Sequence, residues 1–254
     1  MSLLLVEDHG AVRVLTLNRP EKKNALNEPL AAALTEALEV AADDADVHVV
    51  VVVGSEGTFC AGADVHLFLE AGRGGKVPEV VVNIHEALRA FPKPLIAGVE
   101  GLAVGMGVTL LPHFDMVYAN RSAKLYVPFA RLGLVVEYGS SFTLPRLIGR
   151  QRANELVLRG KPVDATTAAD WGLVTRVFED AEFRERVLEV AADVGALPSG
   201  AVRASKALLR EGEERTLDEA IADEADVLSG LYGSEENIRA VEAFLNRAAR
   251  SRPS

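Results

Sequence analysis

The segment 91–115 constrains the fold more than any other stretch of the sequence. Two prolines open it, and the apolar run that follows, 95–99, is typical of a short buried strand. Glycines at 101, 105 and 107 then lead directly into another apolar stretch. Glycine permits unusual dihedrals and close approach, and a helix N-terminus offers unpaired N–H groups with a partial positive charge. The segment therefore predicts a strand-to-helix junction that could hold a negatively charged oxygen.

The first two-thirds of the chain repeats the order of strand, loop and helix. Apolar runs at 3–6 and 12–17 predict a hairpin, and the β-branched run 48–53 predicts a strand buried on both faces. A second loop that contains glycines, 54–64, follows that strand and precedes a helix. This loop is a second candidate for holding an anion, although glycines of this kind also serve ordinary turns.

The last part of the chain differs, because only helices are expected beyond Asp180. Before it, the glycine-rich stretch 72–76 predicts an exposed loop. We therefore expect an α/β protein with a core over residues 1–195 and an appended helical region over residues 196–254.

Composition narrows the possible functions of the chain. Its 254 residues, 49% of them hydrophobic, can bury one substantial core, and the net charge of −10 argues against nucleic-acid binding. The lone Cys60 excludes an internal disulfide, the five histidines show no metal-ligand spacing, and no segment is predicted to span a membrane. The chain shows neither a secretory signal nor a peroxisomal address, so we expect a cytoplasmic protein with no metal.

Several ordered stretches together resemble the enoyl-CoA hydratase/isomerase family of the crotonase superfamily over essentially the whole chain. They are 17–20, 24–27, 59–64, 92–99, 101–107, 115–119 and 169–174. The resemblance implies a crotonase-like spiral of ββα turns whose C-terminal helices mediate oligomerisation, as a homotrimer or a dimer of trimers. It also implies acyl-CoA thioester substrates and no cofactor beyond the coenzyme A that the substrate carries.

The same resemblance implies roles for individual residues. The backbone N–H groups of Ala63 and Met106 would hold the thioester oxygen as it becomes an enolate; one such donor is worth about 3–4 kcal/mol. The residues implied to contact substrate or coenzyme A are Lys22, Asn24, Ala25, Ala61, Asp64, Phe129 and Phe244. Two of them have alternative interpretations: Asp64 as an acid in the first turn of a helix, and Phe244 as a core residue of an amphipathic helix.

Two positions depart from the hydratases of this family. Thr109 and Phe129 stand where those enzymes carry two glutamates, and neither side chain can move a proton at neutral pH. Glu137 instead matches the base of peroxisomal-type Δ3,Δ2-enoyl-CoA isomerases; its alternative interpretation is an acid placed near a helix start. If Phe129, Leu134 and Val135 flank Glu137, partial desolvation is expected to raise its pKa.

The prediction is an enoyl-CoA isomerase that shifts a double bond through a dienolate held in an oxyanion hole. Hydration by two glutamates is not expected. Other crotonase-type reactions, including hydration by another route, remain alternatives, as does an acyl-CoA-binding protein without turnover. Dienoyl-CoA isomerisation would need a second acid at Phe129, and dehalogenation would need a more aromatic pocket.

Overall fold

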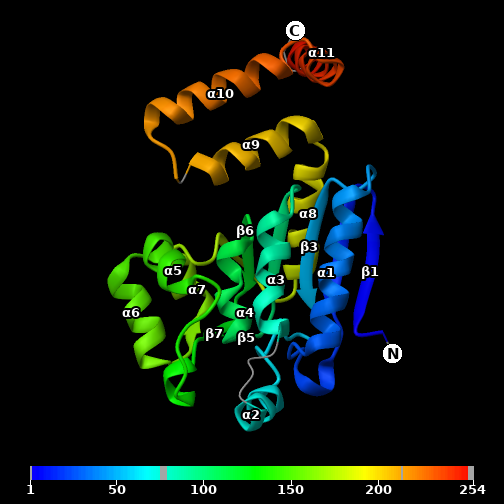
Figure 1. Cartoon of the computed structure of the whole chain (residues 1–254). Coiled ribbons are helices and arrows are strands. Elements are labelled where there is room, and N and C mark those ends of the chain that lie inside the picture. Colours follow the sequence, from blue (N-terminus) through cyan, green and yellow to red (C-terminus); the bar gives the residue numbers. More distant parts are fainter. Residues whose placement is uncertain (1, 75–78, 213, 251–254) are drawn as a thin grey trace.

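A six-stranded sheet forms the centre of the computed structural model, which describes residues 2–74, 79–212 and 214–250 (Figure 1). In spatial order its strands are β1 (Leu4–His9), β2 (Val12–Leu17), β3 (Val49–Gly54), β4 (Leu95–Val99), β6 (Met116–Asn120) and β9 (Arg176–Phe178). β1 and β2 form an antiparallel hairpin, and the other neighbours run parallel. The predicted hairpin is therefore confirmed.

A second, three-stranded sheet consists of β5 (Leu102–Val104), β7 (Lys124–Tyr126) and β8 (Val163–Asp164). The sequence did not predict it, because strands of two or three residues carry no visible alternation. In two successive turns of the chain, β4–β5 and β6–β7, the first strand joins the large sheet and the second joins the small one. An isolated β-bridge between Cys60 and Ala103 of β5 also connects the segment that follows β3 to the small sheet. This is the expected spiral of ββα turns.

Helices cover both faces of the large sheet. α1 (Glu28–Asp43) and α3 (Glu79–Ala90) lie on one face, and α8 (Phe183–Gly195) lies on the other. The valines of β3 are buried alternately, with Val50 and Val52 in one apolar cluster and Val49, Val51 and Val53 in the cluster that contains α8. The prediction of a strand buried on both faces is confirmed.

Short helices fill the turns of the spiral. They are α2 (Val65–Gly74), α4 (Met106–Thr109), α5 (Ser140–Ile148), α6 (Arg150–Arg159), α7 (Ala165–Trp171) and the 3₁₀ turns η1 (Pro20–Lys22), η2 (Leu111–His113) and η3 (Phe129–Leu132). The loop predicted at 72–76 is wrong for residues 72–74, which end α2, because exposed glycines are tolerated at a helix end. Residues 75 and 76 lie outside the described part of the chain.

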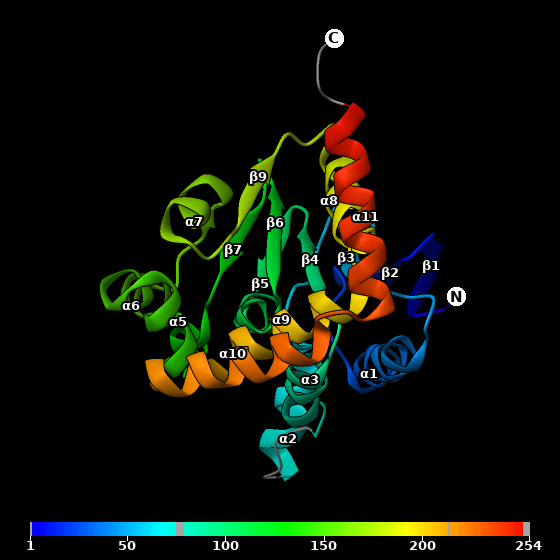
Figure 2. The ribbon, with the colours of Figure 1, turned by 90° about the horizontal axis from the view of Figure 1, so that it is seen from above.

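Three helices follow α8, namely α9 (Ser199–Gly212), α10 (Leu217–Leu231) and α11 (Glu235–Arg250). They lie at one end of the sheet, while α2 lies at the opposite end. Figure 2 shows α9 and α10 side by side, with α11 turning away from both. Lys206 ties α9 to the core, because its ammonium donates to the carbonyl of Lys93 at 2.7 Å and to Asp115 at 2.6 Å. The helical end of the chain is confirmed, and the boundary at 195/196 stays a prediction.

No helix within residues 2–74, 79–212 and 214–250 combines the length and the apolar character needed to cross a bilayer.

Candidate active site

Two loops of the spiral meet at the start of α4. Gly62 has a φ of +90°, and a methyl group added there would lie 2.7 Å from the carbonyl oxygen of Val104. A methyl group on Gly107 would lie 2.6 Å from the carbonyl oxygen of Cys60. Real Cβ atoms do not approach backbone that closely, so both positions require glycine. The two glycines allow the loop around 60–63 to pack directly against the N-terminus of α4.

This packing places two backbone amides next to each other. Leu26 donates to the carbonyl of Gly62 and Asp64 donates to the carbonyl of Leu26, so the N–H of Ala63, which lies between them, points to the other side. Met106 begins α4, where an amide has no partner within the helix, and its nitrogen lies 3.6 Å from the point that a methyl group on Gly62 would occupy. Within the described part of the chain, neither amide donates a hydrogen bond.

The N-terminal loop 19–26 holds the loop around 60–63 from outside. Arg19 donates to Asp64 at 2.9 Å and to the carbonyl of Ala25 at 3.1 Å. Burial alone would raise the pKa of Asp64, but the hydrogen bonds from Arg19 and from the amide of His66 lower it below its usual range. Asp64 is thus engaged at the start of α2, and this contact favours its interpretation as a helix-start acid.

The residues of these two loops that are implied to contact coenzyme A differ in their exposure to solvent. Asn24 is fully buried, and its amide group exchanges hydrogen bonds with Arg19, Ser55 and Thr58. The Asn24 side chain therefore links the loop 19–26 to the loop after β3, and its proximity to coenzyme A stays a prediction. Lys22 is exposed, Ala61 is half-buried and Ala25 is buried.

Glu137 lies in the loop between η3 and α5, and its side chain is folded inward. Its Oε1 atom is buried and has no hydrogen-bond partner within the described residues. Burial raises the pKa of Glu137 to about 7. The predicted desolvation is confirmed, but its predicted cause is partly wrong: Leu134 and Val135 are 41% and 85% exposed. Of the three residues expected to flank the carboxylate, only Phe129 is buried.

The positions that replace the two hydratase glutamates are both buried. Thr109 is inaccessible to solvent, and its hydroxyl has no partner within the described residues. Phe129 is buried too, with its ring 3.7 Å from the position of a methyl group on Gly105, the residue before Met106. Cys60 is buried as well, and this burial raises the pKa of its thiol to about 11.

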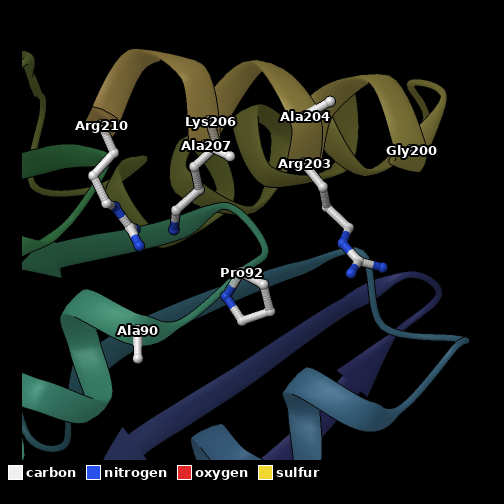
Figure 3. A pocket seen from close by; sticks show the side chains of 8 residues that line it. All are labelled: Ala90, Pro92, Gly200, Arg203, Ala204, Lys206, Ala207 and Arg210. Carbon is white, nitrogen blue, oxygen red and sulfur yellow. The ribbon is translucent and has the colours of Figure 1, made fainter. Parts of the chain in front are cut away.

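Two of the cavities that α9 lines have neither Ala63 nor Met106 among their lining residues. One, of about 470 Å³, lies between α9 and the turn before β4, and Arg203, Lys206 and Arg210 point into it (Figure 3). Two of these cations are already engaged: Lys206 with Asp115, and Arg210 with the carbonyls of residues 89 and 91. The other, of about 990 Å³, is lined by His85, His113, Tyr138, Phe142, Leu197 and Leu209 among others. Neither is lined by Glu137.

The remaining expectations concern metals and the C-terminus. Among the described residues, no three His, Cys, Asp or Glu side chains gather as metal ligands would. Phe244 on α11 is 65% exposed, so it is not a core residue of this chain. His113 and Tyr138, which are joined by a hydrogen bond at the Glu137 loop, were given no role from the sequence, where no motif marks the contact between them.

Comparisons with known proteins agree with this geometry. The chain is 37% identical to human enoyl-CoA delta isomerase 2 over 256 residues, which cover 98% of this chain and 64% of that protein. It is 34% identical to the 2,3-dehydroadipyl-CoA hydratase of Escherichia coli K12, with 97% of each chain covered. A solved structure from Magnetospirillum magneticum AMB-1, described as a putative enoyl-CoA hydratase/carnithine racemase, superposes with a TM-score of 0.89 at 36% identity, covering 97% of each chain. The sequence pattern described as "Enoyl-CoA hydratase/isomerase" matches residues 7–251, and the chain therefore belongs to the enoyl-CoA hydratase/isomerase family of the crotonase superfamily.

Proposed function

We propose that this protein is an enoyl-CoA isomerase that converts 3-enoyl-CoA thioesters into 2-enoyl-CoA thioesters with Glu137 as its base. The observation that carries the proposal is the carboxylate of the half-buried Glu137: its Oε1 atom is buried without a hydrogen-bond partner within the described residues, and its pKa is raised to about 7. A base of that pKa is matched to proton abstraction near neutral pH.

The reaction begins with the thioester oxygen on the N–H groups of Ala63 and Met106. Glu137 takes a proton from C2, and the electron pair of the C–H bond spreads into a dienolate whose negative charge reaches that oxygen. The two amides stabilise this charge as it develops. Protonated Glu137 then returns its proton to C4, so the double bond moves from C3–C4 to C2–C3. No water is added and no cofactor takes part.

One carboxylate suffices because its two proton transfers are sequential. Thr109 and Phe129 occupy the other candidate positions for an acid, and neither can donate a proton at neutral pH. The names of the human and rat relatives, both enoyl-CoA delta isomerase 2 at 37% and 36% identity, support isomerisation. Relatives named as hydratases are of similar identity, so the test must measure hydration as well.

The proposal also assigns the substrate's coenzyme A to the outer face of the loop 19–26, beside Lys22, Ala25 and Ala61. It further assigns α10, α11 and the turn between them to contacts between copies of this chain, since they expose several large apolar side chains that water does not favour. These are Leu217, Ile221, Leu228, Tyr232, Ile238, Val241, Phe244 and Leu245. A solution mass equal to three or six chains is the expected result, and a monomeric mass contradicts this assignment.

The decisive experiment compares wild type with Glu137→Gln on 3-enoyl-CoA substrates of short, medium and long chain. Glutamine keeps the shape of the side chain but cannot accept the C2 proton, so kcat is expected to fall by a factor of about 10²–10⁴ while acyl-CoA binding persists. In wild type, kcat/KM is expected to rise with pH through about 7, as Glu137 ionises. Hydration of a 2-enoyl-CoA is measured beside it. Wild type that hydrates but does not isomerise any chain length contradicts the proposal.

A further inference from the structure

His113 connects the two halves of the candidate active site. It ends η2, which follows α4 with only Leu110 between them, and α4 begins with the oxyanion donor Met106. The Nε2 atom of His113 lies 2.9 Å from the carbonyl oxygen of Tyr138, the residue directly after Glu137. A carbonyl can only accept, so Nε2 carries the hydrogen and donates it. A single hydrogen bond thus joins the segment of the amides to the loop of the base.

The residue that accepts this bond has a strained backbone. Tyr138 has a φ of +53°, in the left-handed region that a bulky side chain seldom occupies. Such a conformation persists only where the surroundings enforce it, and such residues gather at functional sites. Here the surroundings are visible: Tyr138 is buried, and the centroid of its ring lies 5.3 Å from that of His85. Behind it, the amide of Ser140 donates to the carbonyl of Glu137 at 3.0 Å.

The charge of His113 is also controlled. Burial lowers its pKa below the usual value, and the nearby guanidinium groups of Arg89 and Arg210 lower it further, against the hydrogen bond to Tyr138. The ring is therefore neutral at the pH where Glu137 works, and it keeps one N–H to donate. It follows that a pH profile of turnover near neutrality reports on Glu137 rather than on His113.

We propose that His113 and Tyr138 are positioning residues, which together hold the Glu137 carboxylate at a fixed place relative to the amides of Ala63 and Met106. The proposal rests on the proposed function of Glu137 as a base. In this proposal His113 contributes to catalysis without contacting the substrate. Its hydrogen bond holds the carbonyl of Tyr138, and the backbone conformation of Tyr138 in turn determines where the Glu137 side chain points.

His48 offers a matched control. Its Nδ1 atom forms a hydrogen bond of 2.8 Å with the carbonyl oxygen of Gly195, which ties the start of β3 to the end of α8. The two histidines thus make the same type of ring-to-carbonyl bond, and both are half-buried. Only the bond of His113 reaches the loop of Glu137. If both bonds serve only to stabilise the fold, replacing either histidine is expected to have the same consequences.

The experiment compares His113→Leu, His113→Gln and His48→Leu. His113→Leu is expected to lower kcat at least tenfold with KM within twofold of wild type, and to shift the pH midpoint of kcat/KM. His113→Gln, whose amide can still donate, is expected to recover kcat to within about threefold. His48→Leu is expected to lower the melting temperature while leaving kcat within twofold.

A second pair of variants tests the coupling. Tyr138→Gly removes the strain and lets the backbone relax, so it is expected to lower kcat, and combining it with His113→Leu is expected to lower kcat little further. Additive losses contradict the proposal, as does a kcat of His113→Leu equal to that of wild type. An equal loss of kcat in His48→Leu also overturns it, since the effect is then one of general stability.

The two proposals can fail separately. Exchange of the C2 protons of a saturated acyl-CoA with deuterated water requires only the base and the amides, without a double bond to move. Wild type that exchanges but does not isomerise defeats the proposed function and leaves exchange as the measure of positioning by His113. Wild type that isomerises, with all His113 variants unchanged in isomerisation and exchange, defeats only the further inference. Wild type that does neither overturns both.

Discussion

The two halves of the candidate active site are built in different ways. The amide half is made of main chain, and hydrogen bonds from Leu26 and Asp64 and the close contacts of Gly62 and Gly107 fix it in place. The base half is a side chain on a loop with exposed flanks, where buried polar atoms of Glu137, Tyr138 and Ser140 have no partner within the described residues.

This contrast has a physical reason. Donors that must not move during the reaction cost least when packing and backbone hydrogen bonds already hold them. A group that must gain and lose a proton cannot be fully satisfied in one state, because strong partners would pull its pKa away from neutrality. Among the described residues, buried polar atoms without a partner are accordingly more numerous beside the base, in Glu137, Tyr138 and Ser140, than in α4, where Thr109 has one.

The most severe test of the amide half is Gly107→Ala. Its methyl group would meet the carbonyl oxygen of Cys60 at 2.6 Å, and since that atom is backbone, α4 must move away from the loop around 60–63. Displacing the Met106 amide is expected to lower kcat by about 10²–10³, the loss typical of one oxyanion donor. Gly72→Ala is the control, since a methyl group there meets no atom of the described residues within 4 Å. Full activity of Gly107→Ala would show that the close contact between Gly107 and Cys60 does not determine the position of the Met106 amide.

In the base half, Glu137→Gln is expected to lower activity but to increase stability above the pKa of the carboxylate. The pKa of Glu137 rises from a usual value of 4.5 to about 7 in the folded protein. Between those values the folded state binds a proton that the unfolded state has lost, so wild-type stability falls as pH rises through this window. Glutamine does not ionise, and Glu137→Gln is expected to gain about 1–3 kcal/mol over wild type at pH 8 relative to pH 4.

Urea unfolding of both proteins across this pH range measures the difference. The exposed Glu86 supplies the comparison, because Glu86→Gln is expected to show no such gain. A gain of Glu137→Gln that does not change between pH 4 and pH 8 contradicts the burial of the carboxylate.

The smallest expected effect concerns the exposed flank of the base loop. Val135 is 85% exposed, so its side chain contributes little to the shielding of Glu137. Val135→Ser is expected to change the free energy of unfolding by less than about 0.5 kcal/mol, and kcat by less than twofold. A tenfold loss of kcat, or a lower pH midpoint, would restore the shielding role that the sequence suggested for this residue.

Local patterns were sufficient to predict much of the architecture. The hairpin, the buried β3 and the C-terminal helices follow from runs of apolar residues whose spacing repeats over several residues. The small sheet escaped prediction because β5 and β8 are only three and two residues long. The glycines at 62 and 107 were identified as candidates for an anion site, but their close contacts with Val104 and Cys60 join segments distant in the chain.

For the site, the resemblance to the family singled out Glu137, Thr109 and Phe129, and residue type then decided that only Glu137 can carry a proton near neutral pH. Only the tertiary structure decided the rest. It placed Asn24 in the interior, buried the Oε1 atom of Glu137 and brought His113 to the carbonyl of Tyr138. Burial and hydrogen bonding depend on segments that are distant in sequence, and contacts of this kind produce no periodic pattern of residues from which they could be predicted.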